Sequence, residues 1–371
     1  MKAGWEIKKL GEVCKLYQPK TISVEMLVED GEYLVYGANG IIGHYNQYNH
    51  EDSEVLLTCR GATCGSINIS EPYSWINGNA MVVKPLDKNN IKQQFLKYYL
   101  ISVDWNDIIT GAAQPQITRL SLSPLPIPIP PLSEQEQIVA ELDLISGIIE
   151  KKKQQLKELD SLAQSLFYEM FGNPVENDKG WEVEKLSNKA EISSSKRIFA
   201  SEYTDDGVPF YRGKEVTEKS KGNPISVELY ISQDRYNEIR LNYGVPSIGD
   251  ILVTAVGTIG NIWVVDSDEE FYFKDGNVLW IKIKDNTNPI YFKYILTVLI
   301  DEYKEMMANG CAYSALTIAN LKEMPTCVTP LSLQQEFASK IESIEKQKEL
   351  IKQSLQETET LFNSRMDFYF N

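Results

Sequence analysis

The amino-acid sequence predicts an α+β fold with an internal repeat. Two tandem globular parts contain mixed helices and strands, and two long helices pair as an antiparallel coiled coil. Three observations predict this fold. A Gly-Trp-Glu motif at 4–6 returns at 180–182, a Pro-Leu-Ser motif at 131–133 returns at 330–332, and a heptad pattern of apolar residues follows each Pro-Leu-Ser motif. We expect such an internal repeat to have pseudo-twofold symmetry.

The repeat divides the chain of 371 residues into four segments. A hydrophobic content of 43% is enough to form two ordinary cores. The offset between matching residues grows from 176 at the Gly-Trp-Glu motifs to 195 at two glycine-rich turns, so the second globular part holds about 19 extra residues, between Arg212 and Gly257. The expected segments are a first globular part at 1–130, a first long helix at 131–172, a second globular part at 173–330 and a second long helix at 331–371.

Both globular parts show the same order of short elements. A buried strand leads into a glycine-rich turn and a further strand, and a tight turn then leads into another strand and a helix. In the first part the leading strand, the glycine-rich turn, the tight turn and the helix are expected at 54–58, 60–65, 77–79 and about 91–103, and in the second part at 250–254, 257–260, 275–277 and 289–308.

A proline-rich junction precedes the first long helix. Prolines alternate along 124–131, which removes backbone donors and favours a stiff extended chain, so this segment is expected to be a spacer and not a strand. Ser133 with Glu136 has the form of a capping box, and Ser332 with Gln335 repeats it. Both long helices are therefore expected to begin at the serine.

The long helices carry apolar residues at strict 4-3 spacing over more than four heptads, and one lysine interrupts each stripe, Lys152 and Lys348. Pairing of the two helices would cover both stripes. Separate packing of each helix on its own globular part is the alternative. The residues expected in helix pairing are Ile138, Leu142, Ile145, Ile149, Leu156, Phe337, Ile341, Ile344, Ile351 and Leu355.

Composition indicates a cytoplasmic protein without a metal site. No apolar run approaches the ~20 residues of a membrane span, and the first residues lack the apolar stretch of a secretory signal. Five cysteines without CxxC spacing are expected to be reduced thiols.

Motifs for catalysis are missing from the sequence. It has no phosphate-binding Gly-x-x-x-x-Gly-Lys-Ser/Thr loop, no dinucleotide motif, no His-Glu-x-x-His, no Asn/Asp-Pro-Pro-Tyr/Phe run of amino-methyltransferases and no Pro-Asp followed by Glu-x-Lys as in many nucleases. The sequence has only two histidines, His44 and His50, which makes a catalytic triad improbable. We therefore expect no catalytic residue and no reaction carried by this chain alone.

Polar side chains at the two glycine-rich turns, in further polar loops and at the densest basic points of the second globular part are candidates for contacts with DNA. Arginine can bind guanine or phosphate with two hydrogen bonds, and glutamine can pair with adenine. The alternative is that the glycines only form a turn and that the charges are solvated. The candidates are Thr58, Arg60, Thr63, Gln114, Gln116, Arg119, Lys196, Arg197, Arg212, Lys214, Thr254, Thr258, Tyr313 and Ser314.

A net charge of −15 argues against a solitary, non-specific DNA binder, because phosphate contacts come from lysine and arginine. The charge is unevenly placed. Residues 1–130 carry 11 basic and 13 acidic side chains, a balance of −2, whereas 173–330 carry 17 and 24, a balance of −7. The charge therefore permits a subunit whose partner supplies much of the phosphate contact.

Together these features resemble the specificity subunit of type I restriction-modification systems. The resemblance rests on the repeated Gly-Trp-Glu openings, on Gly-Asp-Ile-Leu-Val-Thr at 249–254 with Gly-Thr-Ile-Gly at 257–260, and on the proline-to-helix junction at 128–138. It implies two target recognition domains, each reading one half of a gapped DNA sequence, and two spacer helices that dock modification subunits.

The resemblance also implies the partners. These are double-stranded DNA, two methyltransferase subunits and, as an optional addition, a restriction and translocase subunit, with no membrane. Methyl transfer and cleavage would belong to the partner subunits, and S-adenosylmethionine, ATP and Mg²⁺ would bind there, so the chain itself needs no cofactor. The alternatives are a coiled-coil scaffold that never contacts DNA and a single-chain restriction-methylation enzyme.

Overall fold

The computed structural model describes residues 4–111, 114–284, 286–308 and 315–371. The chain forms two compact units. The first unit comprises residues 1–154 and 352–371, and the second unit comprises residues 155–351. The two long helices, α4 (Leu132–Phe171) and α10 (Leu331–Phe370), each contribute to both units.

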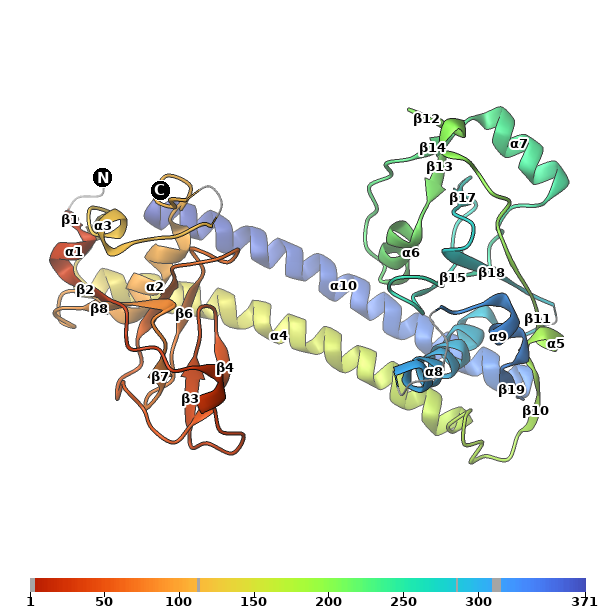
Figure 1. Cartoon of the computed structure of the whole chain (residues 1–371), viewed down its shortest axis with the longest axis horizontal. Coiled ribbons are helices and arrows are strands. Elements are labelled where there is room, and N and C mark those ends of the chain that lie inside the picture. The colour runs from red at the N-terminus through yellow and green to blue at the C-terminus, as the bar shows by residue number, and fades with distance from the viewer. Residues whose placement is uncertain (1–3, 112–113, 285, 309–314) are drawn as a thin grey trace. The chain divides into compact units, whose positions relative to one another are not determined.

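In the first unit a four-stranded antiparallel sheet in the order β2-β8-β5-β6 lies beside a three-stranded sheet in the order β4-β3-β7, and β1 pairs with β9 (Figure 1). The strands are β1 (Glu6–Lys9), β2 (Cys14–Tyr17), β3 (Tyr33–Tyr36), β4 (Ile41–Tyr45), β5 (Val55–Thr58), β6 (Ile67–Ile69), β7 (Trp75–Ile76), β8 (Ala80–Pro85) and β9 (Pro126–Ile129), and the helices besides the long ones are α1 (Leu10–Val13), η1 (Val24–Met26), α2 (Gln93–Ser102) and α3 (Arg119–Leu122).

The second unit repeats this plan with the sheets β11-β18-β15-β16, β12-β14-β13-β17 and β10-β19. The stretch between β13 and β15 is longer than its counterpart in the first unit and contains α6, β14 and α7. The predicted α+β fold with an internal repeat is confirmed. The strands are β10 (Glu182–Lys185), β11 (Ala190–Ser194), β12 (Tyr203–Thr204), β13 (Val208–Tyr211), β14 (Tyr230–Ile231), β15 (Ile251–Thr254), β16 (Ile262–Val264), β17 (Tyr272–Phe273), β18 (Val278–Ile283) and β19 (Pro325–Val328), and the helices are α5 (Leu186–Lys189), η2 (Ala200–Glu202), α6 (Gly213–Ser220), α7 (Gln233–Asn242), α8 (Pro289–Ala308) and α9 (Ile318–Glu323).

The proline-rich junction is a strand, so the prediction of a spacer was wrong. Strand β9 pairs antiparallel with β1, with Ile7 opposite Pro128 and Lys8 opposite Ile127. Proline has no backbone N–H group. Because the prolines alternate, the missing N–H groups all fall on the same side of the strand, and an edge strand needs no donors on its unpaired side. The alternation also places Ile127 and Ile129 in the core, where both are buried.

Both long helices begin one residue before the predicted serine. The carbonyl of Pro131 accepts hydrogen bonds from the amides of Glu134 and Gln135 at 2.9 and 3.0 Å, and the carbonyl of Pro330 does the same at the start of α10. Proline is suited to this position because only its carbonyl is needed there. The serines therefore lie inside the first turn.

The long helices run antiparallel to each other within each unit. In the first unit Lys152 Nζ donates to Ser354 Oγ at 2.8 Å and to Thr358 Oγ1 at 2.6 Å, and Arg365 Nη2 donates to Glu141 Oε2 at 2.9 Å. In the second unit Lys348 Nζ lies 2.7 Å from Asp160 Oδ1 and 2.9 Å from Glu345 Oε1. The lysines that interrupt the stripes are thus satisfied by polar partners, in agreement with the high cost of an unpaired charge at a helix interface.

The apolar stripes cover the cores of the globular parts as well as each other. Ile138, Leu142 and Met366 belong to the core of the first unit, and Phe167 and Phe337 belong to the core of the second. The predicted pairing of the helices is therefore confirmed, and the paired helices also pack on the globular parts, so the alternative of separate packing without pairing is wrong. Of the residues predicted for helix pairing, Ile138, Leu142, Ile145, Ile149, Phe337, Ile341 and Ile344 are buried, and Leu156, Ile351 and Leu355 are half-buried.

Replacement of Phe337 by alanine tests this packing. The ring is fully buried and lies 5.0 Å from Tyr294 and 5.4 Å from Phe171 between ring centroids. We expect Phe337→Ala to lower the free energy of unfolding by about 3–5 kcal/mol, measured by urea titration. Leu350→Ala on the same helix, with 61% of the side chain exposed, should change it by less than about 0.5 kcal/mol. Equal effects of the two variants would contradict the packing.

Candidate nucleic-acid interface

The glycine-rich turn of the first unit lies against the loop that follows α2. Gly61 N donates to Pro115 O at 3.1 Å, and Arg60 and Gln116 form a backbone bridge. Four of the predicted DNA-contacting residues therefore share one region, which we name the first corner, and all four side chains are exposed. They are Arg60, Thr63, Gln114 and Gln116.

Glycine is required at the end of both turns. Gly65 has φ +97° and Gly260 has φ +89°, a conformation that residues with a side chain rarely adopt. A Cβ at Gly65 would lie 2.7 Å from Trp105, and a Cβ at Gly260 would lie 2.8 Å from Ile300. Both turns are thus held tightly against the body of their unit, which fixes the side chains that precede the glycine.

Two of the predicted contacts with DNA are excluded by burial. Thr58 and Thr254, at matching ends of β5 and β15, are fully buried. Their hydroxyl groups donate to Ala38 O and Thr258 O, each at 2.5 Å. The two threonines therefore stabilise the turns through buried hydrogen bonds, and their side chains cannot contact DNA.

The turn of the second unit borders a depression of about 500 Å³, which we name the second corner. Thr258 is exposed here, beside the start of α6. Asn261 fixes the turn, because its Nδ2 donates to Thr258 O at 2.9 Å. Of the predicted residues, the second corner brings together Arg212, Lys214 and Thr258.

The basic side chains of the second corner are paired with carboxylates. Arg212 Nη2 lies 2.7 Å from Glu215 Oε1 and 2.8 Å from Glu228 Oε2, and Lys214 Nζ lies 2.6 Å from Glu228 Oε1. Glu215 and Glu228 raise the pKa of Arg212, and Lys214 and Arg212 hold the pKa of Glu228 at about 2. The buried Glu215 fixes Arg212, whereas the exposed Glu228 occupies the place that a phosphate could take.

The other predicted residues lie outside the two corners. Arg119 is exposed at the first position of α3. Lys196 Nζ lies 4.9 Å from the ring centroid of Tyr243, and Arg197 lies 3.7 Å from Asp275 Oδ2. Tyr313 and Ser314 fall outside the residues that the structure describes.

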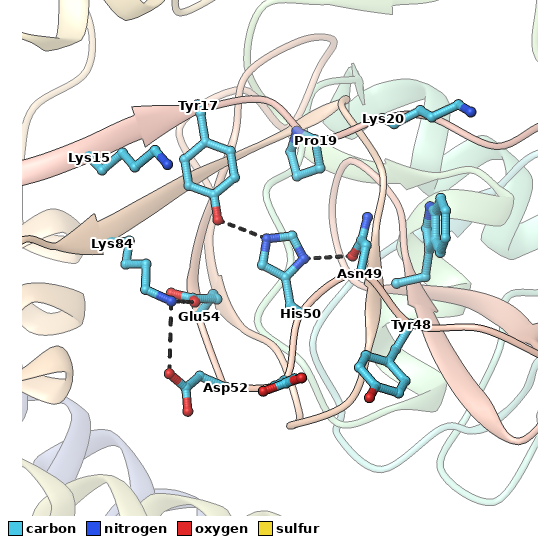
Figure 2. Close-up of a pocket in the computed structure, with 12 residues that line it drawn as sticks. Lys15, Tyr17, Pro19, Lys20, Tyr48, Asn49, His50, Asp52, Glu54 and Lys84 are labelled. Carbon is cyan, nitrogen blue, oxygen red and sulfur yellow. Dashed lines mark hydrogen bonds and ion pairs between the residues drawn. The ribbon is translucent and has the colours of Figure 1, made fainter.

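A pocket of about 710 Å³ in the first unit was missed by sequence reasoning (Figure 2). Its walls come from β2, β8 and the loop before β5, which are far apart in sequence. The alternation of exposed Lys15 and half-buried Tyr17 with buried Cys14 and Leu16 is the one signal that the sequence held for it. The side chains on the pocket wall include Lys15, Tyr17, Lys20, Tyr48, His50, Asp52, Glu54, Trp75 and Lys84.

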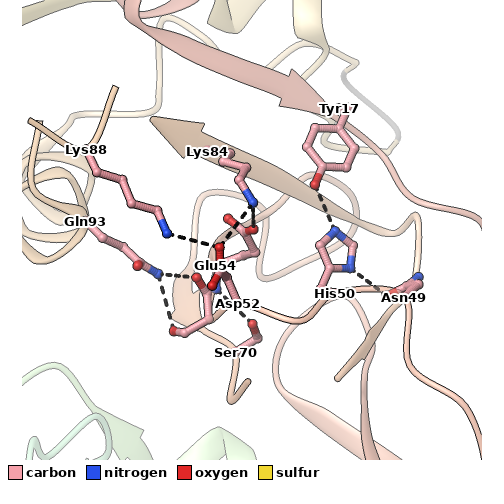
Figure 3. A network of polar contacts seen from close by, with 10 residues as sticks. Tyr17, Asn49, His50, Asp52, Glu54, Ser70, Lys84, Lys88 and Gln93 are labelled. Atoms are coloured by element: carbon pink, nitrogen blue, oxygen red, sulfur yellow. Dashed lines mark hydrogen bonds and ion pairs between the residues drawn. The ribbon is translucent and has the colours of Figure 1, made fainter. Parts of the chain in front are cut away.

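Lys84 of this pocket pairs with two carboxylates of the same wall (Figure 3). Lys84 Nζ contacts the carboxylate of Glu54, which is 4% exposed, and lies 3.8 Å from Asp52 Oδ2. Asp52 also lies 3.0 Å from Lys88. Burial raises the pKa of Glu54, and the hydrogen bond to Glu54 raises the pKa of Lys84. Because these carboxylates neutralise Lys84, this lysine is a weaker candidate for phosphate binding than Arg60 of the first corner.

His50 on the same wall is held by two hydrogen bonds. Its Nδ1 lies 2.6 Å from Asn49 Oδ1, and its Nε2 lies 2.8 Å from the hydroxyl of Tyr17 (Figure 3). Asn49 Oδ1 also accepts from Ile76 N, so Nδ1 of His50 is the donor in its hydrogen bond with Asn49. Burial, with a smaller effect of Lys84, lowers the pKa of His50.

Three features bear on other site classes. Among the described residues, no three His, Cys, Asp or Glu side chains are grouped so that they could hold a metal ion. The described cysteines, Cys14, Cys59, Cys64 and Cys327, are free thiols, and Cys311 lies outside the described residues. No helix in the described ranges combines the length and apolar character needed to cross a membrane.

The pH dependence of the free energy of unfolding tests whether the pKa of His50 is lowered in the folded protein. A folded-state pKa below the unfolded value of about 6.5 stabilises the fold above that pH, and this contribution is lost as the pH falls towards the folded pKa. We expect the free energy of unfolding to fall between pH 7.5 and 5.5 and His50→Gln to reduce this dependence, measured by urea titration. The exposed His44 gives the matched control, His44→Gln. An unchanged pH dependence in His50→Gln would contradict the assignment.

Comparison with known proteins identifies the family. Residues 2–160 and 178–360 match the type I restriction modification DNA specificity domain. A Haemophilus influenzae protein that bears the name of a type I restriction enzyme specificity subunit is 28% identical over 349 residues, covering 92% of this chain and 87% of that protein. The EcoprrI specificity subunit of Escherichia coli is 29% identical over 140 residues, covering 37% and 34%.

The fold is also similar to solved structures. The S subunit of a type I restriction-modification system from M. genitalium superposes with a TM-score of 0.61 at 15% identity, covering 99% of this chain and 97% of that one. A structure from a study of assembly and conformational transition of the type I R-M system gives a TM-score of 0.57 at 18% identity, covering 100% and 98%. With both halves matched by the same domain family, the chain belongs to the type I restriction-modification DNA specificity proteins and carries two DNA specificity domains.

Proposed function

We propose that this chain is the DNA-reading subunit of a type I restriction-modification complex and that each unit reads one half of a gapped target. The observation that carries the proposal is the matching position of the two corners in the two repeats. Each corner follows a buried strand and a glycine-rich turn, and each presents exposed polar side chains. Two similar reading surfaces fit a two-part target better than one catalytic pocket does.

The first corner supplies the clearest base contacts. Arg60 is exposed and makes no hydrogen bond or ion pair with other described side chains, so its guanidinium is available for guanine or phosphate. Gln114 and Gln116 supply amides of the kind that pair with adenine. At the second corner, Lys214 and Thr258 take this role, and DNA phosphate would displace Glu228 from Lys214.

Partner subunits complete the proposed complex. Two methyltransferase subunits would dock on the long helices, and a restriction and translocase subunit would join in systems that cleave DNA. Methyl transfer and cleavage, with S-adenosylmethionine, ATP and Mg²⁺, belong to these partners in the proposal. A scaffold that never meets DNA and a single-chain restriction-methylation enzyme are less favoured, because both halves of the chain match the DNA specificity domain.

Binding of DNA by the reconstituted complex tests the proposal, with Arg60→Ala as the informative variant. Loss of one bidentate contact should weaken binding to the specific target by about 1–3 kcal/mol, measured by fluorescence anisotropy at fixed salt. Arg240→Ala is the matched control, because this exposed arginine on α7 pairs with Glu270 and lies outside both corners. Binding that is insensitive to salt and to DNA sequence would exclude the DNA-reading function.

Lengthening both helices tests whether they set the separation of the half-sites. A heptad inserted after Lys153 in α4, with a second inserted after Ile351 in α10, keeps the apolar stripes in phase. At 1.5 Å per residue the insertion adds about 10 Å, close to three base pairs of DNA. We expect the gap between methylated half-sites to lengthen by about three base pairs, mapped by sequencing of methylated adenines. An unchanged gap would contradict the role of the helices as a ruler.

A further inference from the structure

A buried glutamine joins the first long helix to the globular part of the first unit. Gln135, in the first turn of α4, has none of its side chain exposed. Its Oε1 accepts from Lys92 N at 2.9 Å, and its Nε2 donates to Pro130 O at 2.9 Å and to Asn90 O at 2.8 Å. One amide thus connects the end of β9, the start of α4 and the residue that precedes α2.

The second unit contains the same arrangement 199 residues later in the chain. Gln334, in the first turn of α10, is 5% exposed. Its Oε1 accepts from Asn288 N at 2.9 Å, directly before α8, and its Nε2 donates to Thr329 O at 3.0 Å and to Thr329 Oγ1 at 3.2 Å. In both units the glutamine binds the carbonyl five residues before itself and the amide directly before the next helix of the globular part.

This geometry requires a primary amide. One atom must accept and another must donate towards two acceptors, and glutamine offers both on a side chain long enough to reach them. A carboxylate would turn its second oxygen towards carbonyl oxygens, and an apolar side chain would leave buried backbone groups without partners. The repeat preserved the glutamine and its backbone partners, although Asn90 O in the first unit is replaced by Thr329 Oγ1 in the second.

We propose that Gln135 and Gln334 are positioning residues for DNA reading. Each fixes the angle at which the globular part of its unit leaves the long helix, and so restricts the gap between the two half-sites to one length. This inference rests on the proposed function. The glutamines themselves do not touch DNA in it, and the identity of the bases in each half-site does not depend on them.

A small change of angle is sufficient to alter the gap. A domain of about 130 residues has a radius of gyration of ~14 Å, so its far face lies roughly 30 Å from the helix that carries it. A rotation of about 7° then moves that face by the ~3.4 Å rise of one base pair. Backbone hydrogen bonds at the point of attachment are well placed to prevent such a rotation.

The test uses the full chain in complex with its methyltransferase subunit and maps methylated adenines on genomic DNA. The variants are Gln135→Met and Gln334→Met. The matched controls are Gln137→Met and Gln335→Met, because Gln137 and Gln335 are exposed in the same turns of the same helices. We expect Gln135→Met and Gln334→Met to keep the bases of both half-sites. Both variants should methylate sites with a gap one base pair longer or shorter at least tenfold more often than the wild type. Both controls should keep a single gap.

The outcomes separate the inference from the proposed function. If the folded variants Gln135→Met and Gln334→Met keep a single gap, or lose methylation at all sites alike, the positioning role is excluded. Either result is the one expected when these glutamines only stabilise the fold. If the wild-type complex shows no two-part motif, the proposed function itself fails. Should Gln135→Met not fold, Gln135→Glu replaces it, since the carboxylate keeps the volume and the acceptor for Lys92 N.

Discussion

The antiparallel contact between α4 and α10 is the interaction on which both units depend, because the core of each unit takes side chains from both helices. The core of the first unit includes Leu142 from α4 and Met366 from α10, which are more than 200 residues apart in sequence. The core of the second unit includes Phe167 from α4 and Phe337 from α10. Each globular part therefore completes its core only when the two helices are paired.

Polar contacts within the helix pair define its register. An apolar stripe alone would tolerate a shift by one heptad, whereas Lys152 with Thr358 and Arg365 with Glu141 are satisfied in one register only. At the other end of each globular part, Gln135 or Gln334 connects the first turn of a long helix to the start of α2 or α8. The register contacts are half-buried, whereas Gln135 and Gln334 form their hydrogen bonds in the buried interior.

The fold was predictable where its signal is periodic or repeated. The heptads and the matching turns predicted the long helices, the strands β5 and β15 and the internal repeat, because these signals depend on local spacing. The strand β9 was missed, since prolines were weighed as missing donors without the pairing partner that makes alternate donors unnecessary. Long-range pairing of this kind is not visible in a single local segment.

The site was predictable only in part, because a residue's type does not reveal whether its side chain faces solvent. Arg60 and Gln116 were predicted as separate candidates and the structure joins them, but Thr58 and Thr254 point inward at the ends of buried strands. The pocket around His50 was missed because it is built from β2, β8 and the loop before β5. Glu228, which neutralises Lys214, lies between Arg212 and Gly257, where the second unit is longer than the first, so the repeat could not indicate it.

We propose that this chain makes a methyltransferase subunit read a two-part DNA sequence. The most direct measurement maps methylated adenines across a genome in cells that express the methyltransferase subunit with and without this chain. We predict one gapped, two-part motif that disappears when the chain is absent. Methylation that persists without the chain, or that never forms a two-part motif with it, would contradict the account.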